Sequence, residues 1–263
     1  MIKKSLEAAK NTVKQTISKL KKLYITRLIL RCVIFAFCLF LYVKEPEQFH
    51  VLHGLNFFKK FSILHILWLI WIIDMLVQIV PSKATVSIGS LKLFKKHFTK
   101  SSVPYEKAAM RLHFRNANIS AAIIFAIWVV LISAIGILHS KNIVNEAEMF
   151  MMSALFYVFD LVCVVIWCPF RIILRTRCCT TCRIFNWDHL MMYTPMLFIK
   201  GFYSVSLLVI ATIVFIEWEL SLILYPERFW DKSNCSLKCS ECKDKLCPTI
   251  TLANIKKMMN KKK

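Results

Sequence analysis

Long apolar stretches constrain the fold of this chain more than any other feature of its sequence. Four of them contain about 20 residues each and span 23–43, 61–80, 119–138 and 149–170. A helix of roughly 20 residues crosses a hydrocarbon core of about 30 Å. A soluble domain of 263 residues has too small a core to bury several helices that are apolar on every side. The sequence therefore predicts an all-α fold, a polytopic transmembrane helical bundle.

The last apolar region allows two interpretations. It spans 190–225 and is interrupted by Pro195 and by Lys200-Gly201. In one interpretation only 201–225 crosses the membrane, which gives five spans. In the other, a short span at 186–199 precedes it, which gives six. We favour six, although 14 residues of helix reach only about 21 Å and need local thinning of the bilayer or protein neighbours.

Lysine and arginine are concentrated in alternate connections between the spans. The basic segments are 1–27, 81–117, 171–194 and the tail that follows Pro226, with eight, eight, four and ten basic residues. The connections 44–60 and 139–148 contain only three and one. Basic connections stay in the cytoplasm. We therefore expect a multi-pass protein of the cell membrane with a cytoplasmic N-terminus, and six spans also keep the basic tail inside.

This arrangement divides the chain into three parts. Residues 1–22 repeat apolar side chains at three- and four-residue spacing between lysines, which predicts a basic amphipathic helix on the membrane surface. Residues 23–225 form the transmembrane bundle, with cytoplasmic loops at 81–117 and 171–185. Residues 226–263 form a cysteine-rich, basic tail. The net charge of +21 favours anionic lipid headgroups rather than nucleic acid as a partner, because the basic residues lie between apolar runs.

Cysteine is the residue type that most clearly points to chemistry. Seven of the eleven cysteines form two short clusters, a CCxxC and a Cx3Cx2Cx4C, which contain Cys178, Cys179 and Cys182, and Cys235, Cys239, Cys242 and Cys247. The other four lie within or beside spans, where cysteine acts as a small apolar residue. They are Cys32, Cys38, Cys163 and Cys168.

The clusters predict a metal site. The four closely spaced tail thiolates suit a tetrahedral Zn²⁺ ion, and an iron–sulfur cluster is a chemical alternative. The CCxxC has only three thiols, and Asp188 or His189 would complete it. With the tail inside, all seven thiols form one metal-binding cap with a structural, sensory or accessory role in a membrane complex. Structural disulfides and unmetallated thiols are the simpler alternatives.

A second hypothesis uses the CxxC formed by Cys179-Thr180-Thr181-Cys182. In this feature the chain resembles membrane thiol oxidases of the disulfide-forming and vitamin K epoxide reductase types, which are small helical bundles with a CxxC beside a span. The resemblance implies a membrane thiol–disulfide oxidoreductase with a reversible CxxC.

Charged residues inside the expected spans support a third hypothesis. They are Arg31, Asp74, Asp160, Glu217 and Glu219. Charge inside a bilayer is costly and is usually paired or functional. We expect Arg31 to pair with Asp74 or Asp160. A functional acidic layer would indicate a small ion or solute transporter, whereas a structural one would only hold helices together.

Two further motifs carry a resemblance. The segment 182–189 (CRIFNWDH) and the segment 226–230 (PERFW) resemble a group of bacterial cysteine-rich polytopic membrane proteins. This resemblance implies a location in the bacterial inner membrane and no particular activity.

The composition excludes some enzyme classes. With only four glycines, the chain has no glycine-rich phosphate loop or dinucleotide motif. Whether the protein is an enzyme is left open by the sequence.

Overall fold

A computed structural model describes residues 19–80, 88–176 and 178–238 of the chain. Within these residues the fold is helical, with two isolated β-bridges and no strand. The long helices are α2 (Lys19–Lys44), α3 (Leu64–Ile79), α5 (Lys107–Ser140), α6 (Glu146–Val165) and α9 (Phe202–Leu224). Short helices α4 (Ser90–Leu93), α7 (Phe170–Leu174) and α8 (Asp188–Tyr193) lie between them. The amphipathic helix predicted at 1–22 lies almost entirely outside the described residues.

Four helices, α2, α5, α6 and α9, are long and apolar enough to cross a membrane, and α3 is a shorter apolar helix of 16 residues. Their outward faces are apolar as well. Val130 is 70% exposed and Ile29 is 60% exposed, and similar side chains cover each long helix. Such extensive exposed apolar surface marks a membrane-facing protein. These are the features of a multi-pass membrane protein.

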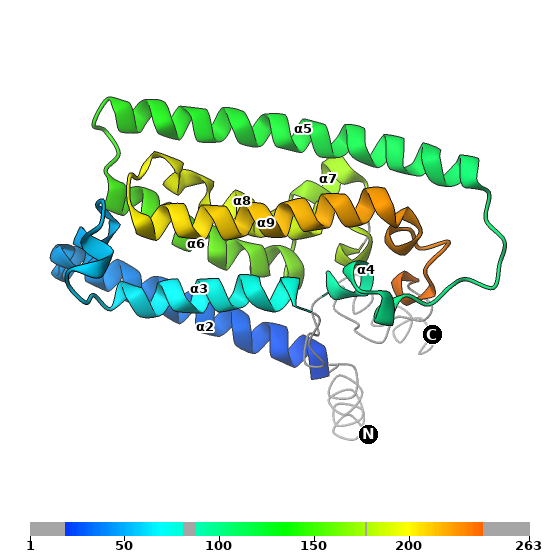
Figure 1. Ribbon diagram of the computed structural model, residues 1–263, viewed down its shortest axis with the longest axis horizontal. Coiled ribbons are helices and arrows are strands. Elements are labelled where there is room, and N and C mark those ends of the chain that lie inside the picture. The colour runs from blue at the N-terminus through cyan, green and yellow to red at the C-terminus, as the bar shows by residue number, and fades with distance from the viewer. Residues whose placement is uncertain (1–18, 81–87, 177, 239–263) are drawn as a thin grey trace, which may run out of the picture.

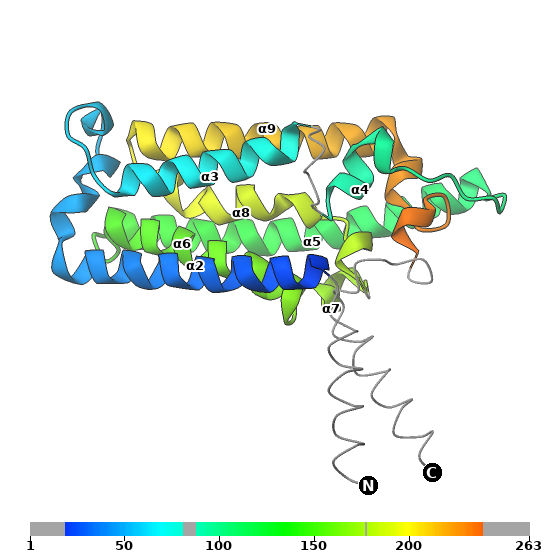
Figure 2. The ribbon, with the colours of Figure 1, turned by 90° about the horizontal axis from the view of Figure 1, so that it is seen from below.

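The helices alternate in direction between two ends of the bundle (Figures 1 and 2). At one end, here called the Gly201 end, an isolated bridge joins Gly54 to Gly201. At the other, here called the α4 end, a bridge joins Lys100 to Asn234. The segment of α8 and the following 3-10 helix η6 (Thr194–Phe198) packs between α6 and α9 and leads back to the Gly201 end (Figure 1).

Several helix boundaries differ from the sequence expectation, and three of them have a local explanation. α3 begins at Leu64 rather than 61, because Ser62 and His65 form a local turn in which the Ser62 hydroxyl accepts a hydrogen bond from the Leu64 amide. α5 begins at Lys107 rather than 119, since the alanines and other helix-favouring residues of 107–118 continue the helix. α6 ends at Val165, four residues before Pro169.

The start of α6 follows directly from its sequence. The Asn145 side chain accepts a hydrogen bond from the Glu148 amide at 2.8 Å, and the Glu148 carboxylate accepts one from the Asn145 amide at 2.8 Å. This capping box satisfies two amides that the first turn leaves without partners.

An aromatic core holds α3, α6, α8 and α9 together. Trp71 lies 5.5 Å from Phe150 and 5.2 Å from Tyr193 between ring centroids. Tyr203 packs on Phe150 and donates a hydrogen bond to the Leu64 carbonyl at 3.1 Å. Because Tyr193 is the last residue of α8, this core fixes the depth at which α8 enters the bundle.

Close backbone contact at the Gly201 end requires glycine. A Cβ atom on Gly201 would overlap the carbonyl oxygen of Leu52. Gly54 has a positive φ of 53° but open space around its Cβ position. We therefore expect Gly201→Ala to destabilise the folded protein by about 1–3 kcal/mol. Thermal unfolding in detergent measures this change.

Gly54→Asn is the matched control, because asparagine tolerates a positive φ and its side chain would meet no neighbouring atom at the Cβ position. It should unfold close to the wild-type temperature. A Gly201→Ala protein as stable as Gly54→Asn would contradict the close approach of these two segments.

Candidate functional site

Arg31 lies at the centre of a buried polar cluster in the bundle. Its side chain donates hydrogen bonds to Asp160 at 2.6 Å and to Asp74 at 2.9 Å. It also donates to the Tyr157 carbonyl at 2.7 Å, and its guanidinium lies 3.8 Å from the Tyr157 ring centroid. Arg31 is only 7% exposed, so these partners replace the water that a charge otherwise needs. Arg31 thus pairs with both of the expected aspartates and joins α2, α3 and α6.

Helix α8 adds two polar residues to this cluster. His189 is 2% exposed. Its Nδ1 atom lies 3.2 Å from the Asp188 carboxylate, and its Nε2 atom lies 3.9 Å from the Asp74 carboxylate. We call Arg31, Asp74, Asp160, Asp188 and His189 the polar cluster. Its three carboxylates face one arginine and one histidine, so the cluster has a formal charge of −1 with the imidazole protonated and −2 with it neutral.

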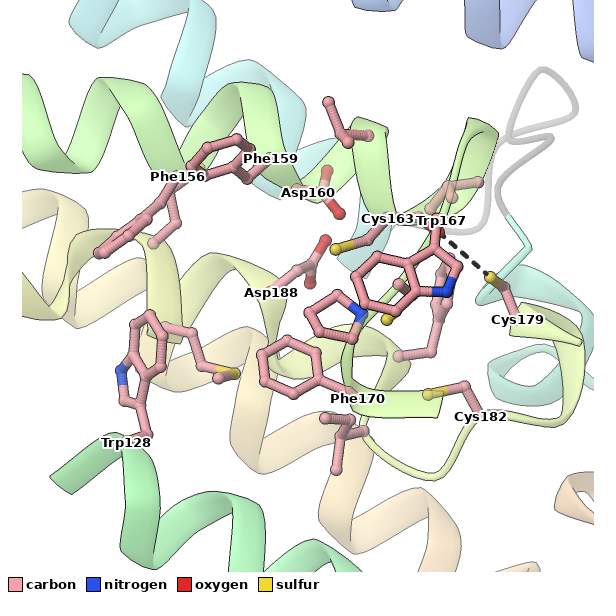
Figure 3. Close-up of a pocket in the computed structure, with 18 residues that line it drawn as sticks. Trp128, Phe156, Phe159, Asp160, Cys163, Trp167, Phe170, Cys179, Cys182 and Asp188 are labelled. Atoms are coloured by element: carbon pink, nitrogen blue, oxygen red, sulfur yellow. Dashed lines mark hydrogen bonds between the residues drawn. The ribbon is translucent and has the colours of Figure 1, made fainter. Parts of the chain in front are cut away.

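A cavity of about 400 Å³ lies beside the polar cluster. Asp160 and Asp188 line it, and Figure 3 shows their carboxyl groups close to each other at its edge. Four cysteines line the same cavity, namely Cys163, Cys168, Cys179 and Cys182. Six aromatic side chains complete the wall, and they are Trp128, Phe156, Phe159, Trp167, Phe170 and Phe185. Phe159 and Trp167 are also exposed on the outer surface of the bundle, so an aromatic edge of the cavity reaches that surface.

The CxxC forms a compact turn on the loop that follows α7. Residues Cys179–Thr181 form a single 3-10 turn, and the Cys182 amide donates to the Cys179 carbonyl at 3.1 Å. The sulfur atoms of Cys179 and Cys182 are directed toward the cavity (Figure 3). The Cys179 thiol approaches the Cys163 carbonyl at 3.9 Å. Burial raises the pKa of Cys179 to about 12 and that of Cys182 to about 11. Both are therefore thiols at neutral pH.

A buried lysine lies behind the CxxC. Lys92 is 1% exposed, and its ammonium group donates a hydrogen bond to the Cys182 carbonyl at 2.7 Å. It also lies 5.1 Å from the Trp218 ring. Burial lowers the pKa of Lys92 to about 8, and its positive charge opposes the rise in the pKa of Cys182. Among the described residues Lys92 has no carboxylate partner.

Arg183 fastens the loop of the CxxC to α9. Its guanidinium binds both carboxylate oxygens of Glu219, at 2.7 and 2.6 Å. The Trp187 indole donates to the same carboxylate at 2.7 Å. Glu217 has no hydrogen bond or ion pair with any described residue. The two glutamates expected in the layer of Arg31 are therefore not part of the polar cluster.

The described residues do not form the expected metal site. They contain no group of three or more histidine, cysteine, aspartate or glutamate side chains placed to hold a metal ion. His189 is directed at Asp188 and Asp74, so it does not complete a set with the CCxxC. The eight described cysteines are not joined to one another by disulfide bonds. Cys239, Cys242 and Cys247 lie outside the described residues.

Cys235 lies apart from the cavity, at the α4 end. It is buried, and its amide donates to the Thr99 carbonyl at 2.8 Å. The neighbouring Asn234 side chain donates to the Leu91 and Arg228 carbonyls. The first cysteine of the tail cluster is thus held firmly against the 88–106 segment.

Sequence reasoning missed several residues of the site. The sequence predicts Asp188 and His189 only as metal ligands, and Cys163 and Cys168 only as small apolar residues. Two adjacent polar residues at the start of a short apolar run were the available signal for Asp188 and His189. Comparison with protein-family models, with curated proteins and with solved structures found no match to the chain.

Removing the central charge tests the polar cluster. Arg31→Met leaves two partly buried carboxylates without their common partner, which should destabilise the fold by about 3–5 kcal/mol. Unfolding in mixed detergent micelles measures the loss. The matched control is Arg27→Met, because Arg27 is exposed on the same helix and should change stability little. Equal stability of the two variants would show that Arg31 does not hold the cluster together.

Proposed function

We propose that this protein is a thiol–disulfide oxidoreductase of the cell membrane in which Cys179 and Cys182 are the redox-active pair. The observation that carries the proposal is the cavity, where four thiols and two carboxylates meet within an aromatic wall. A pair of thiols two residues apart closes a disulfide readily and exchanges it with a partner.

The proposal includes six membrane crossings and a cytoplasmic N-terminus. The alternating directions of the helices, with α8 and η6 as a short fifth crossing, support it (Figures 1 and 2). The basic residues of the connections at the α4 end support the orientation. The crossing formed by α8 and η6 is too short to span the hydrocarbon core alone. Because it packs between α6 and α9, protein neighbours rather than lipid surround it.

The electron acceptor proposed is a lipid-soluble quinone. A cavity of about 400 Å³ falls within the size range of small-molecule sites. Aromatic side chains suit a planar ring, and the exposed Phe159 and Trp167 at its edge let a membrane-dissolved molecule enter from the lipid. In this proposal the carboxylates of the polar cluster transfer protons, and they do not form a pathway for a transported solute.

The reaction balances as a two-electron exchange. The S–H bonds of Cys179 and Cys182 break, one S–S bond forms between them, and the two electrons pass to the quinone. The two protons pass to the quinone oxygens and give a quinol. A partner dithiol then reduces the disulfide by thiol–disulfide exchange and becomes oxidised itself. Asp160 and Asp188 line the same cavity, and in this proposal they relay the thiol protons.

Quinone-dependent oxidation of the purified protein tests this function. Under anaerobic conditions a soluble quinone analogue should remove two free thiols per chain and form one quinol. The rate should increase as the pH is raised toward the pKa of Cys182, about 11, because the thiolate is the reactive form. Thiol titration and quinol absorbance measure the two products.

Cys179→Ser and Cys182→Ser should each abolish the reaction. In Cys182→Ser the remaining Cys179 should attack the disulfide of an oxidised partner, release one partner thiolate and stay trapped as a mixed disulfide, because no second cysteine is present to displace it. Cys32→Ser is the control, since Cys32 is exposed on α2 away from the cavity. Complete retention of thiols with excess quinone, or equal rates in all variants, would disprove the redox function.

Metal binding by the tail is a second proposal, in which Cys235, Cys239, Cys242 and Cys247 hold Zn²⁺ or an iron–sulfur cluster. The firm attachment of Cys235 to the Thr99 carbonyl supports it, because an anchored first ligand lowers the ordering cost of the others. Anaerobically purified protein should contain one zinc ion or one cluster per chain, and Cys239→Ser with Cys242→Ser should lose it. Metal content unchanged by this pair would exclude the tail as the ligand set.

A further inference from the structure

A second cavity, of about 660 Å³, lies at the α4 end on the other side of Lys92. Residues of α5, of α7 and of the loop that follows α7 line it, together with Lys92 of α4. Its charged side chains are Lys92, Arg175 and Arg183, with His113 beside them. No aspartate or glutamate among the described residues lines it. The cavity is therefore strongly basic.

Two of these cations have no anionic partner among the residues that the structure describes. Arg183 is neutralised by Glu219 at 2.6 Å. Lys92 donates only to a backbone carbonyl and lies over the rings of Trp218 and Phe229. Arg175 has no ion pair with a described residue. A fully buried ammonium without an anionic partner carries a large desolvation cost, and an anion in the cavity would offset that cost.

Two local features also point into this cavity. The hydroxyl oxygen of Thr176 is buried, lines the cavity and makes no hydrogen bond with a described residue. Arg175 ends α7 in the left-handed conformation in which helices commonly terminate, with a φ of 51°, and this turn of the chain leaves Arg175 on the cavity lining. A phosphate oxygen would supply an acceptor for both side chains.

The outer rim of the cavity is apolar. Ile119 and Ile123 of α5 line it and are about half exposed on the outer surface of the bundle. A molecule with a charged head and apolar chains would place its head against Lys92 and Arg175 and its chains along α5. Basic pockets between transmembrane helices are known to hold anionic lipid headgroups.

We propose that the cavity bounded by Lys92, Arg175 and Thr176 is a binding site for a phosphate group, with an anionic phospholipid as its source. The site is distinct from the cavity that is lined by the four cysteines, here called the thiol cavity. The proposal does not depend on the redox function. Free phosphate shares the chemistry of the headgroup, and the apolar rim of Ile119 and Ile123 favours the lipid.

Native mass spectrometry of the full chain in detergent tests the proposal with phosphatidylglycerol as the probe. One phosphatidylglycerol should bind per chain above a background of non-specific attachment. Lys92→Met and Arg175→Gln should each weaken binding about tenfold, which corresponds to the loss of one charged hydrogen bond. Lys141→Met is the control, because Lys141 lies at the Gly201 end and should leave the affinity unchanged.

The outcomes separate the sources of phosphate. Displacement of phosphatidylglycerol by inorganic phosphate at millimolar concentration would identify free phosphate as the ligand, and resistance to it would identify the lipid. Arg175 is exposed, so Arg175→Gln remains informative if Lys92→Met does not fold. Binding that is equal in wild type, Arg175→Gln and Lys141→Met, or absent from all, would overturn the proposal.

Discussion

The burial of Arg31 between Asp74 and Asp160 is the interaction on which the rest of the bundle depends. Charges in an apolar interior must be matched by partners from the protein itself. Arg31 comes from α2 and its partners come from α3 and α6, so a single guanidinium determines how three helices are aligned along their axes. Asp74 also faces His189 at 3.9 Å, which extends the same alignment to α8.

The position of α8 in turn creates the site. Because α8 and η6 together are short, the chain before them stays at the α4 end as an irregular loop rather than as helix. That loop contains Cys179 and Cys182 and is fastened to α9 by Arg183 and Glu219. Its two faces border different cavities, one with thiols and carboxylates and one with uncompensated cations. Lys92 lies between them and contacts the Cys182 carbonyl.

Much of the architecture could be predicted from the sequence, because the length of an apolar run is a local property. The helical bundle and the partners of Arg31 follow from such runs and from charge inside them. The partner of Glu219 could not be predicted, since it depends on contact with the distant residue Arg183. The early start of α5 at Lys107 was missed for a different reason, because the length of an apolar run does not report the polar but helix-favouring residues that precede it. The CCxxC spacing shows that Cys178, Cys179 and Cys182 are close together along the chain. It does not determine the directions in which their sulfur atoms point.

The cavity lined by four cysteines shows the same limit, because sequence spacing does not reveal which distant side chains meet in the fold. Cys163 and Cys168 belong to the end of one span, whereas Cys179 and Cys182 belong to a separate loop, and only the fold brings them to one wall. Lys92 has the sequence context of a surface residue, within a basic segment, yet it is 1% exposed. The metal site of the tail remains a prediction, because three of its cysteines lie outside the described residues.

In the function proposed here, the cavity lined by the four cysteines is reached from the lipid and not from water. Labelling of membranes with a lipid-soluble maleimide and with a membrane-impermeant one, followed by mapping of the modified cysteines, measures this directly. Cys163 should react with the lipid-soluble reagent only, as should the exposed Cys32, while the buried Cys38 reacts with neither. Modification of Cys163 by the impermeant reagent would contradict a lipid-facing redox site.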